Sequence, residues 1–578
     1  MRRAAFILAL CLPLLAQTRN DELHELFQDY YEEYLRENPE VATSVGRGEH
    51  NDRWRDWSRP ARQRWTERVE HYRSQLDSFN PEELNLQDGI SWRLLRRQLE
   101  LELAGIDYDA HLIRLNQLFG LHTSVLLTMR EMPTRTHADY EDMIARLRAV
   151  PAYIEQNITA LREAIKKGHV QPRRTADLII GQLDAQAAPS AADSPLLGAF
   201  REFPASIPEA RREALLDRAE DAYVQAFQPA WRRLRDFLSA EYVPAARNSP
   251  AVSALADGED IYRYFIGFHT TLPLTAAEIH EIGKREVERI DRAMQAIVHE
   301  AGFDGTSAEY EQHLLSAPEY LFKDKEAMLA YHRDLAMRVA PGLPALFRKL
   351  PRHRVGIRAI PPDREAVSAS NYNSPSADGT RPGWFNLKAY MAEKQSRFDK
   401  PALVLHETNP GHHLQIALQL ELEGLPEFRK IYHSTAYIEG WALYAESLGS
   451  ALGVYDDPAS RFGALESERF RARRLVVDTG LHAMGWSRQR AIDFLGDESE
   501  VDRYIAWPGQ ALAYKIGQLK IMELKAAACE AYGADFDVRD FHDAVLRNGP
   551  LPLEMLQEQV GDYIGKASGE ASEGCPGV

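Results

Sequence analysis

Apolar residues recur at helical spacing along most of this chain, and this pattern predicts a mainly α-helical protein. The clearest stretch begins at Thr275, which forms a capping-box sequence with Glu278. The apolar positions that follow are three to five residues apart and are expected to face a core: Ile279, Ile282, Val287, Ile290, Met294 and Ile297. Residues 20–350 show a series of such amphipathic segments, separated by breaks such as residues 189–195 and 245–250.

Strand character is confined mainly to residues 355–360 and 383–387. Both segments precede the richest motif of the chain, so we expect a small sheet beside that motif. An edge strand of this sheet could hold a peptide by backbone pairing. We therefore predict a large helical architecture with a small β-sheet, divided into a signal peptide (1–16), a helical region (20–350), a catalytic region (351–564) and a disordered tail (565–578).

The most informative motif is His406-Glu407-Thr408-Asn409-Pro410-Gly411-His412-His413. It opens like the His-Glu-x-x-His motif, in which two histidines on one helix face bind zinc and the glutamate acts as general base. Here Pro410 stands where the second histidine is expected, and proline cannot be a ligand. A metal site at this motif therefore requires a different second ligand.

Helix geometry limits the choice of that second ligand. In an unbroken helix, His412 would lie roughly 240° around from His406, and His413 would lie about 10.5 Å further along the axis. Neither could share one zinc ion with His406. Proline and glycine both favour interruption of a helix, so Pro410-Gly411 predicts a break between Asn409 and His412. Spacing alone leaves His412 and His413 as alternatives.

A third ligand is available downstream. A helix over residues 414–423, a stop at Gly424-Leu425-Pro426 and a returning helix would bring Glu439 back to the histidines. Glu446 lies two turns further along the same face and could orient a ligand histidine.

The two motifs resemble those of the bacterial family known as domain of unknown function 885, whose members are regarded as zinc peptidases. The shared patterns are His-Glu-x-x-Pro-Gly-His-His and Tyr-x-Glu-Gly-Trp-Ala-x-Tyr-x-Glu. The resemblance extends over roughly residues 20 to 565. Further matching blocks are Asn116-Gln117-Leu118, Asp257-Gly258-Glu259 with Tyr262, Asn371-Tyr372, Arg381-Pro382-Gly383 with Asn386, residues 474–482 and residues 508–517.

This resemblance implies a helical fold similar to thimet oligopeptidase and a zinc cofactor bound by His406, His412 and Glu439. His412 is preferred over His413 because relatives of that kind carry a glycine directly before the second zinc histidine, as Gly411 stands here. The implied reaction is hydrolysis of a peptide substrate, with Glu407 as general base.

Other candidate residues lie in the matching blocks. His482 and Tyr514 could donate a hydrogen bond to the developing oxyanion, and Asp478, one turn before His482, could orient it. Asn386, Arg474 and Lys515 are candidates for binding substrate, the last two through a carboxylate.

The amino-acid composition limits which partners the protein is expected to bind. The formal net charge of −17 argues against nucleic acid and anionic membrane surfaces, which would be repelled. Residues 1–16 have a basic start and a short apolar core, typical of a secretory signal, so we expect a periplasmic or secreted protein. No later stretch is long enough to span a membrane. Leu10 stands where lipid attachment at Cys11 would need a small residue, so lipid anchoring is not expected.

Two other classes of function are compatible with parts of the pattern. An exported carrier could bury a metal or ligand without turnover, and a scaffold could keep the fold alone. A carrier does not need a carboxylate beside its ligand histidine, whereas hydrolysis does, so Glu407 favours a zinc metallopeptidase.

Overall fold

The computed structural model describes residues 21–113, 115–361, 365, 369–377 and 379–567. The expected signal peptide (1–16), including Cys11, and residues 568–578 of the expected tail lie outside the described residues. Within them the protein is mainly α-helical with one small sheet, as the apolar periodicity predicts. In the described part of the chain, no helix has both the length and the apolar character that crossing a membrane requires.

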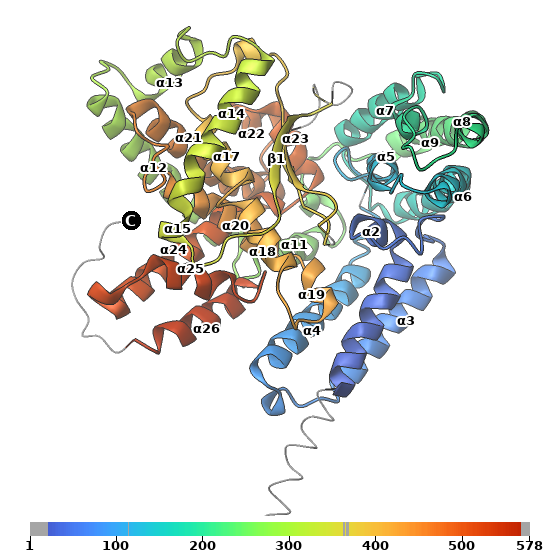
Figure 1. Cartoon of the computed structure of the whole chain (residues 1–578), viewed down its shortest axis with the longest axis horizontal. Helices are drawn as coiled ribbons and strands as arrows, with labels where there is room; N and C mark the ends of the chain where they lie inside the picture. The colour runs from blue at the N-terminus through green and yellow to red at the C-terminus, as the bar shows by residue number, and fades with distance from the viewer. Residues whose placement is uncertain (1–20, 114, 362–364, 366–368, 378, 568–578) are drawn as a thin grey trace, which may run out of the picture. The chain divides into compact units, whose positions relative to one another are not determined.

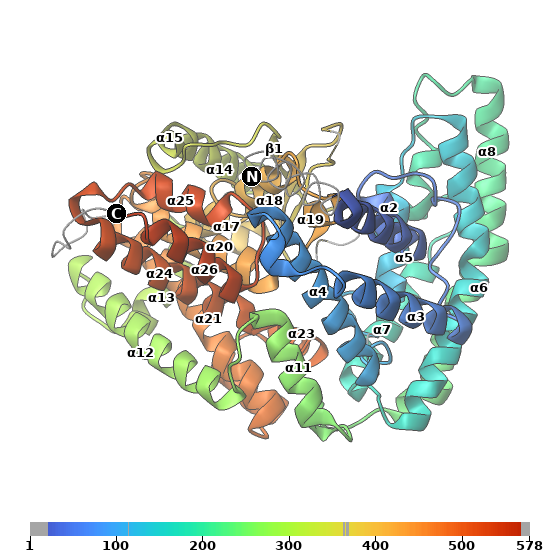
Figure 2. The same cartoon turned by 90° about the horizontal axis from the view of Figure 1, so that it is seen from below.

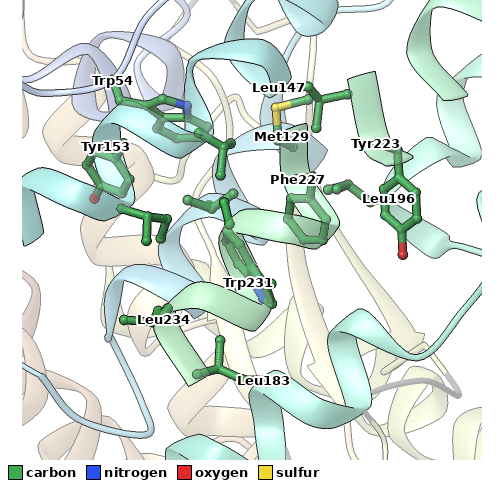
Figure 3. Close-up of a cluster of buried hydrophobic side chains, with 14 of the residues drawn as sticks. Trp54, Met129, Leu147, Tyr153, Leu183, Leu196, Tyr223, Phe227, Trp231 and Leu234 are labelled. Carbon is green, nitrogen blue, oxygen red and sulfur yellow. The ribbon is translucent and has the colours of Figure 1, made fainter. Parts of the chain in front are cut away.

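The chain forms two compact units, of which the first comprises residues 1–261 and 424–431. Its core gathers aromatic and aliphatic side chains, with the rings of Phe227 and Trp231 stacked 4.1 Å apart (Figure 3). In chain order its helices are residues 21–37, α2 (Pro39–Ser44), α3 (Arg59–Leu76), α4 (Leu86–Asp107), α5 (Leu121–Glu131), α6 (His137–Lys167), α7 (Arg173–Ala187), α8 (Glu209–Ala222), α9 (Gln228–Phe237), α10 (Val243–Ala245) and α19 (Glu427–Ile431).

The second unit comprises residues 262–423 and 432–578 and contains the whole predicted site. Residue 350, where sequence analysis divides a helical from a catalytic region, lies inside this unit. Its elements are α11 (Gly258–Thr270, which begins in the first unit), α12 (Ala276–Glu300), α13 (Ser307–Ser316), α14 (Lys325–Val339), α15 (Leu343–Leu346), β1 (Val355–Ala359), β2 (Asn371–Asn373), β3 (Gly383–Leu387), α17 (Lys400–Glu407), α18 (His412–Leu420), α20 (Thr435–Glu446), α21 (Pro458–Ala483), α22 (Arg488–Leu495), α23 (Glu498–Ala506), α24 (Ala513–Tyr532), α25 (Val538–Leu546) and α26 (Leu553–Ile564).

Long paired helices frame the second unit. Thr275 and Glu278 form the predicted capping box at the start of α12. Ile290 and Met294 of the predicted stripe are fully buried, and α12 packs along α21 (Figure 2). Helix α24 packs against α20 and α26 in the same unit.

The small sheet has the strand order β1-β3-β2, with β1 and β3 parallel and β2 antiparallel to β3. Its two longer strands match the predicted segments, and β1 packs beside α14 (Figure 1). Gly383 at the start of β3 allows Tyr372 and His413 to approach, because a Cβ there would lie 2.6 Å from the Tyr372 hydroxyl and 2.9 Å from Nδ1 of His413. The sheet therefore lies beside the start of α18, as predicted.

Candidate metal centre

The predicted helix break is confirmed. Helix α17 ends at Glu407 and α18 begins at His412, with the intervening residues outside any helix. The N–H of Gly411 donates to the carbonyl oxygen of Leu405 at 2.9 Å, and a Cβ on Gly411 would collide with the carbonyl oxygen of His406. Only glycine fits this close approach. The break brings the rings of His406 and His412 to a centroid distance of 4.7 Å.

Helix α20 brings Glu439 to these two histidines. Oε2 of Glu439 lies 3.7 Å from Nε2 of His406 and 3.3 Å from Nε2 of His412. One ligand atom from each of the three residues lies within 4.8 Å of the other two. Two imidazole nitrogens and a carboxylate oxygen at this spacing could hold one metal ion.

Two contacts hold α20 in place. Nε1 of Trp441 donates to the carbonyl oxygen of Pro410 at 2.9 Å, which ties α20 to the helix break. On another side, Gly440 meets Gly517 of α24 so closely that a Cβ on Gly440 would lie 2.5 Å from the carbonyl carbon of Gly517. The register of Glu439 against the histidines is therefore fixed by tight backbone packing.

Glu446, also on α20, orients His406. Its Oε1 lies 2.8 Å from Nδ1 of His406, and both side chains are buried. The carboxylate holds the hydrogen on Nδ1 and so turns Nε2 towards Glu439 and His412. Arg471 lies 3.7 Å from the same carboxylate oxygen.

His413, the alternative second ligand, has both ring nitrogens engaged elsewhere. Its Nε2 lies 3.0 Å from the carbonyl oxygen of His353 and must donate to it. Its Nδ1 then accepts a hydrogen bond from the Tyr372 hydroxyl at 2.9 Å. His412, and not His413, therefore lies beside His406 and Glu439. Tyr372 also stacks near His412, at a centroid distance of 6.3 Å, and was not among the predicted site residues although it lies in a matching block.

The centre is rich in buried negative charge. Glu407 and Glu446 are buried and Glu439 is mostly so, with 17% of its side chain exposed. Burial raises the pKa of Glu407, against the opposing influence of His406 and His412. Burial opposes protonation of His406, but its contacts with Glu439 and Glu446 raise its pKa to about 9. A buried cluster of this kind favours a cation.

The surroundings of one carboxylate oxygen of Glu439 indicate whether a metal ion fits. Oε2 of Glu439 is buried and has no hydrogen-bond partner among the described residues, although it lies between two imidazole nitrogens. A buried carboxylate oxygen without a hydrogen bond is costly. A divalent cation at the centre of the three ligands would satisfy it, so the residues present fit a metal ion.

Tyr514 lies beside the ligand His406. Its ring is nearly parallel to that of His406, at a centroid distance of 6.3 Å. Its hydroxyl accepts a hydrogen bond from Nη2 of Arg503 at 3.1 Å, and the guanidinium of Arg474 lies 4.5 Å from its ring centroid. Arg503 is a component that sequence analysis missed, because a single arginine on a helix carries no distinguishing signal.

The structure gives His482 and Asp478 other partners. His482 is fully buried, and its Nε2 bonds the carbonyl oxygen of Tyr504 at 3.0 Å. Asp478 accepts hydrogen bonds from the Tyr262 hydroxyl at 2.6 Å and from the N–H of Gly509 at 3.1 Å. Burial raises the pKa of Asp478 to about 7. These contacts describe a packed junction of helices and offer no open donor to a substrate.

Two predicted substrate contacts are also engaged within the protein. Lys515 is 1% exposed and its Nζ bonds Glu468 at 2.6 Å and Glu286 at 2.9 Å, so its charge is already neutralised. Asn386 is held within the sheet, where it donates to Asn371 and accepts from Arg358. Both residues therefore have polar partners within the protein.

Comparison with known proteins places the chain among bacterial relatives. A structure described as the "putative lipoprotein from Colwellia psychrerythraea" has 26% sequence identity and a TM-score of 0.90, covering 94% of this chain and 99% of its own. A "putative lipoprotein of unknown function from Shewanella oneidensis" shares the fold at 16% identity and a TM-score of 0.72, covering 93% of this chain and 99% of its own. No curated protein matches the sequence. The family described as "Bacterial protein of unknown function (DUF885)" matches residues 39–560, so the chain belongs to the DUF885 family, as its motifs indicate.

Proposed function

We propose that this protein is an exported zinc-dependent peptidase that hydrolyses peptide bonds of oligopeptides. The observation that carries the proposal is the convergence of His406, His412 and Glu439 beside the buried carboxylate of Glu407. Two histidines and one glutamate are the ligand set of several catalytic zinc sites, which leave one coordination position open. A carrier would need the ligands but not Glu407.

The ligand set favours zinc over other common ions. Calcium and magnesium prefer sites made wholly of oxygen donors, whereas imidazole nitrogens suit zinc. The hydrogen bond from His406 to Glu446 is the arrangement that commonly supports a zinc-bound histidine. Gly411 stands directly before His412, as a glycine precedes the second zinc histidine in thimet oligopeptidase-like enzymes, although the histidine spacing differs from theirs.

The residues of the chain have distinct roles in the proposed reaction. When bound, zinc supplies a Lewis acid that polarises the scissile carbonyl and activates water. Glu407 accepts the proton of the attacking water and passes it to the leaving amine. Its raised pKa suits this task, because a carboxylate that is too acidic is a weak base.

Tyr514 is the proposed donor to the developing oxyanion. Arg503 donates to the Tyr514 hydroxyl and offers no acceptor, so this contact leaves the phenol hydrogen available. Tyr372, by contrast, uses its hydrogen on His413. Tyr514 therefore keeps a hydrogen that it can donate, which favours it over Tyr372. It is also favoured over His482, whose Nε2 bonds the carbonyl oxygen of Tyr504.

Export rests on the secretory pattern of residues 1–16 and on the two relatives described as lipoproteins. A peptidase in the periplasm or outside the cell would meet short peptides.

The proposal is tested by incubating the purified mature chain and its Glu407→Gln variant with a mixed peptide library, read by mass spectrometry. Elemental analysis of both proteins accompanies the assay. We expect zinc in both proteins and cleavage by the wild type alone. Zinc in both with cleavage by neither would favour a metal carrier, and cleavage by both would remove Glu407 from the mechanism.

A further inference from the structure

Two arginines share a single carboxylate beside Tyr514. Arg474 of α21 donates from Nη2 to Oε2 of Glu500 at 3.0 Å, and Nη1 of Arg503 lies 3.3 Å from Oε1 of the same glutamate. Glu500 and Arg503 both belong to α23. The Arg474 side chain is 6% exposed and its Nε and Nη1 atoms are buried without a hydrogen-bond partner among the described residues.

The charges of this cluster do not balance. Two guanidinium groups face one carboxylate, which leaves a buried excess of positive charge. The nearby carboxyl of Asp478 accepts hydrogen bonds from Tyr262 and Gly509. Burial raises its pKa to about 7 although Arg503 acts in the opposite direction, so it offsets the excess only in part. Buried charges are normally paired, so the excess favours binding of an anion.

Arg503 is the more exposed member of the pair. Its side chain is 18% exposed, three times the exposed fraction of Arg474. Its Nη2 donates to Oε1 of Gln510 at 2.5 Å and to the Tyr514 hydroxyl at 3.1 Å, two neutral acceptors that a carboxylate would replace. The Tyr514 ring lies 6.3 Å from that of His406. A peptide segment of about three extended residues would therefore span the distance from the metal ligands to the Arg503 guanidinium.

We propose that Arg503, with Arg474 behind it, binds the C-terminal carboxylate of the peptide substrate, so that the enzyme cleaves close to the free C-terminus. This inference rests on the proposed function and specifies its substrate class. A planar guanidinium matches a carboxylate with two parallel hydrogen bonds, and the excess positive charge offsets the desolvation of the ligand. Lys515, the other predicted candidate, is already paired with two glutamates.

The test uses short N-acetylated peptides in three matched forms: a free acid, the corresponding C-terminal amide, and an amide that carries glutamate as its last residue. For the wild type we expect kcat/KM for the free acid to exceed that for both amides by roughly tenfold to a hundredfold, the range of a charge-assisted hydrogen bond. Equal rates for acid and amide would overturn the inference while leaving the peptidase proposal intact. Cleavage of none of the peptides, nor of a mixed library, would overturn both.

The glutamate amide distinguishes the source of the carboxylate. If it were cleaved as well as the free acid, the subsite would bind an acidic side chain and the assignment to the C-terminus would be wrong. Arg503→Gln should abolish the preference for the acid, mainly through KM, and Arg503→Lys should restore part of it.

Arg488→Gln is the matched control, because Arg488 also pairs with carboxylates on α23, at Asp502 and Glu498. It should keep the preference. An unchanged preference in folded Arg503→Gln would refute the role of Arg503. If that variant did not fold, the comparison of the three peptides with the wild type and with Arg503→Lys would still show whether Arg503 binds the terminal carboxylate.

Discussion

Replacing Gly440 by alanine should disturb the metal centre through helix packing alone. Gly440 has no side chain that could take part in the site. It follows Glu439 directly, and its backbone contacts Gly517 of α24. A Cβ would lie 2.5 Å from the carbonyl carbon of Gly517, whereas carbon atoms in contact prefer about 3.5–4.0 Å. Helices α20 and α24 would have to separate by about 1 Å to accept it.

The expected cost follows from two opposing effects. Alanine in place of a helical glycine stabilises a helix by about 0.5–1 kcal/mol, while overpacking a closely packed site costs about 1–3 kcal/mol. The clash should win because both contacting groups are backbone and cannot rotate away. Metal–ligand distances tolerate only about 0.2 Å of error, so a displacement of Glu439 should weaken zinc binding by at least roughly tenfold.

Gly561→Ala provides the control. Gly561 lies in α26, and a Cβ there would meet nothing within 4 Å. This variant should raise stability slightly and leave zinc affinity unchanged. Thermal unfolding and competition with a chelating dye measure the two properties. The reasoning is refuted if Gly440→Ala matches the stability gain of Gly561→Ala and keeps zinc affinity within about twofold of the wild type.

Three further predictions follow from the surroundings of the centre. Glu446→Gln should weaken zinc binding about 10–100-fold in a chelator competition, because His406 loses its orienting carboxylate; unchanged affinity would contradict this. Tyr514→Phe should lower kcat about 10²–10³-fold with little change in KM, and a loss confined to KM would assign Tyr514 to substrate binding instead. Asp478 has a folded pKa near 7, above its ordinary value of 3.8, so the folded protein holds its proton more tightly and loses stability as pH rises between these values. Asp478→Asn should remove up to about 4 kcal/mol of this loss, and denaturant unfolding at pH 5 and pH 8 should then show a smaller difference than in the wild type.

Much of the fold could be predicted because it depends on periodicity and local punctuation. The capping box at Thr275 and the strands around residues 357 and 385 are local features, and they appear as expected. The break after Glu407 was predictable because proline and glycine act on the backbone of their own segment.

The rest of the site depends on tertiary packing that spacing does not encode. Lys515 and Arg474 have the same charge in the sequence, but only the folded chain shows that Lys515 is neutralised by two glutamates. His413 was distinguishable from His412 only when its contacts with Tyr372 and His353 were known. Side chains that approach from separate helices, as Arg503 does, leave no pattern in one sequence.

The central claim is that His406, His412 and Glu439 hold one zinc ion, and zinc stoichiometry tests it most directly. Wild type, Glu439→Gln and Glu421→Gln would be loaded with zinc, dialysed against a weak chelator and analysed for metal. Glu421 is a suitable control because its carboxylate bonds His353 and Arg352 instead of the ligands. We expect one zinc per chain in the wild type and in Glu421→Gln, with loss of zinc from Glu439→Gln. Wild-type protein without zinc, or full retention by Glu439→Gln, would contradict the account.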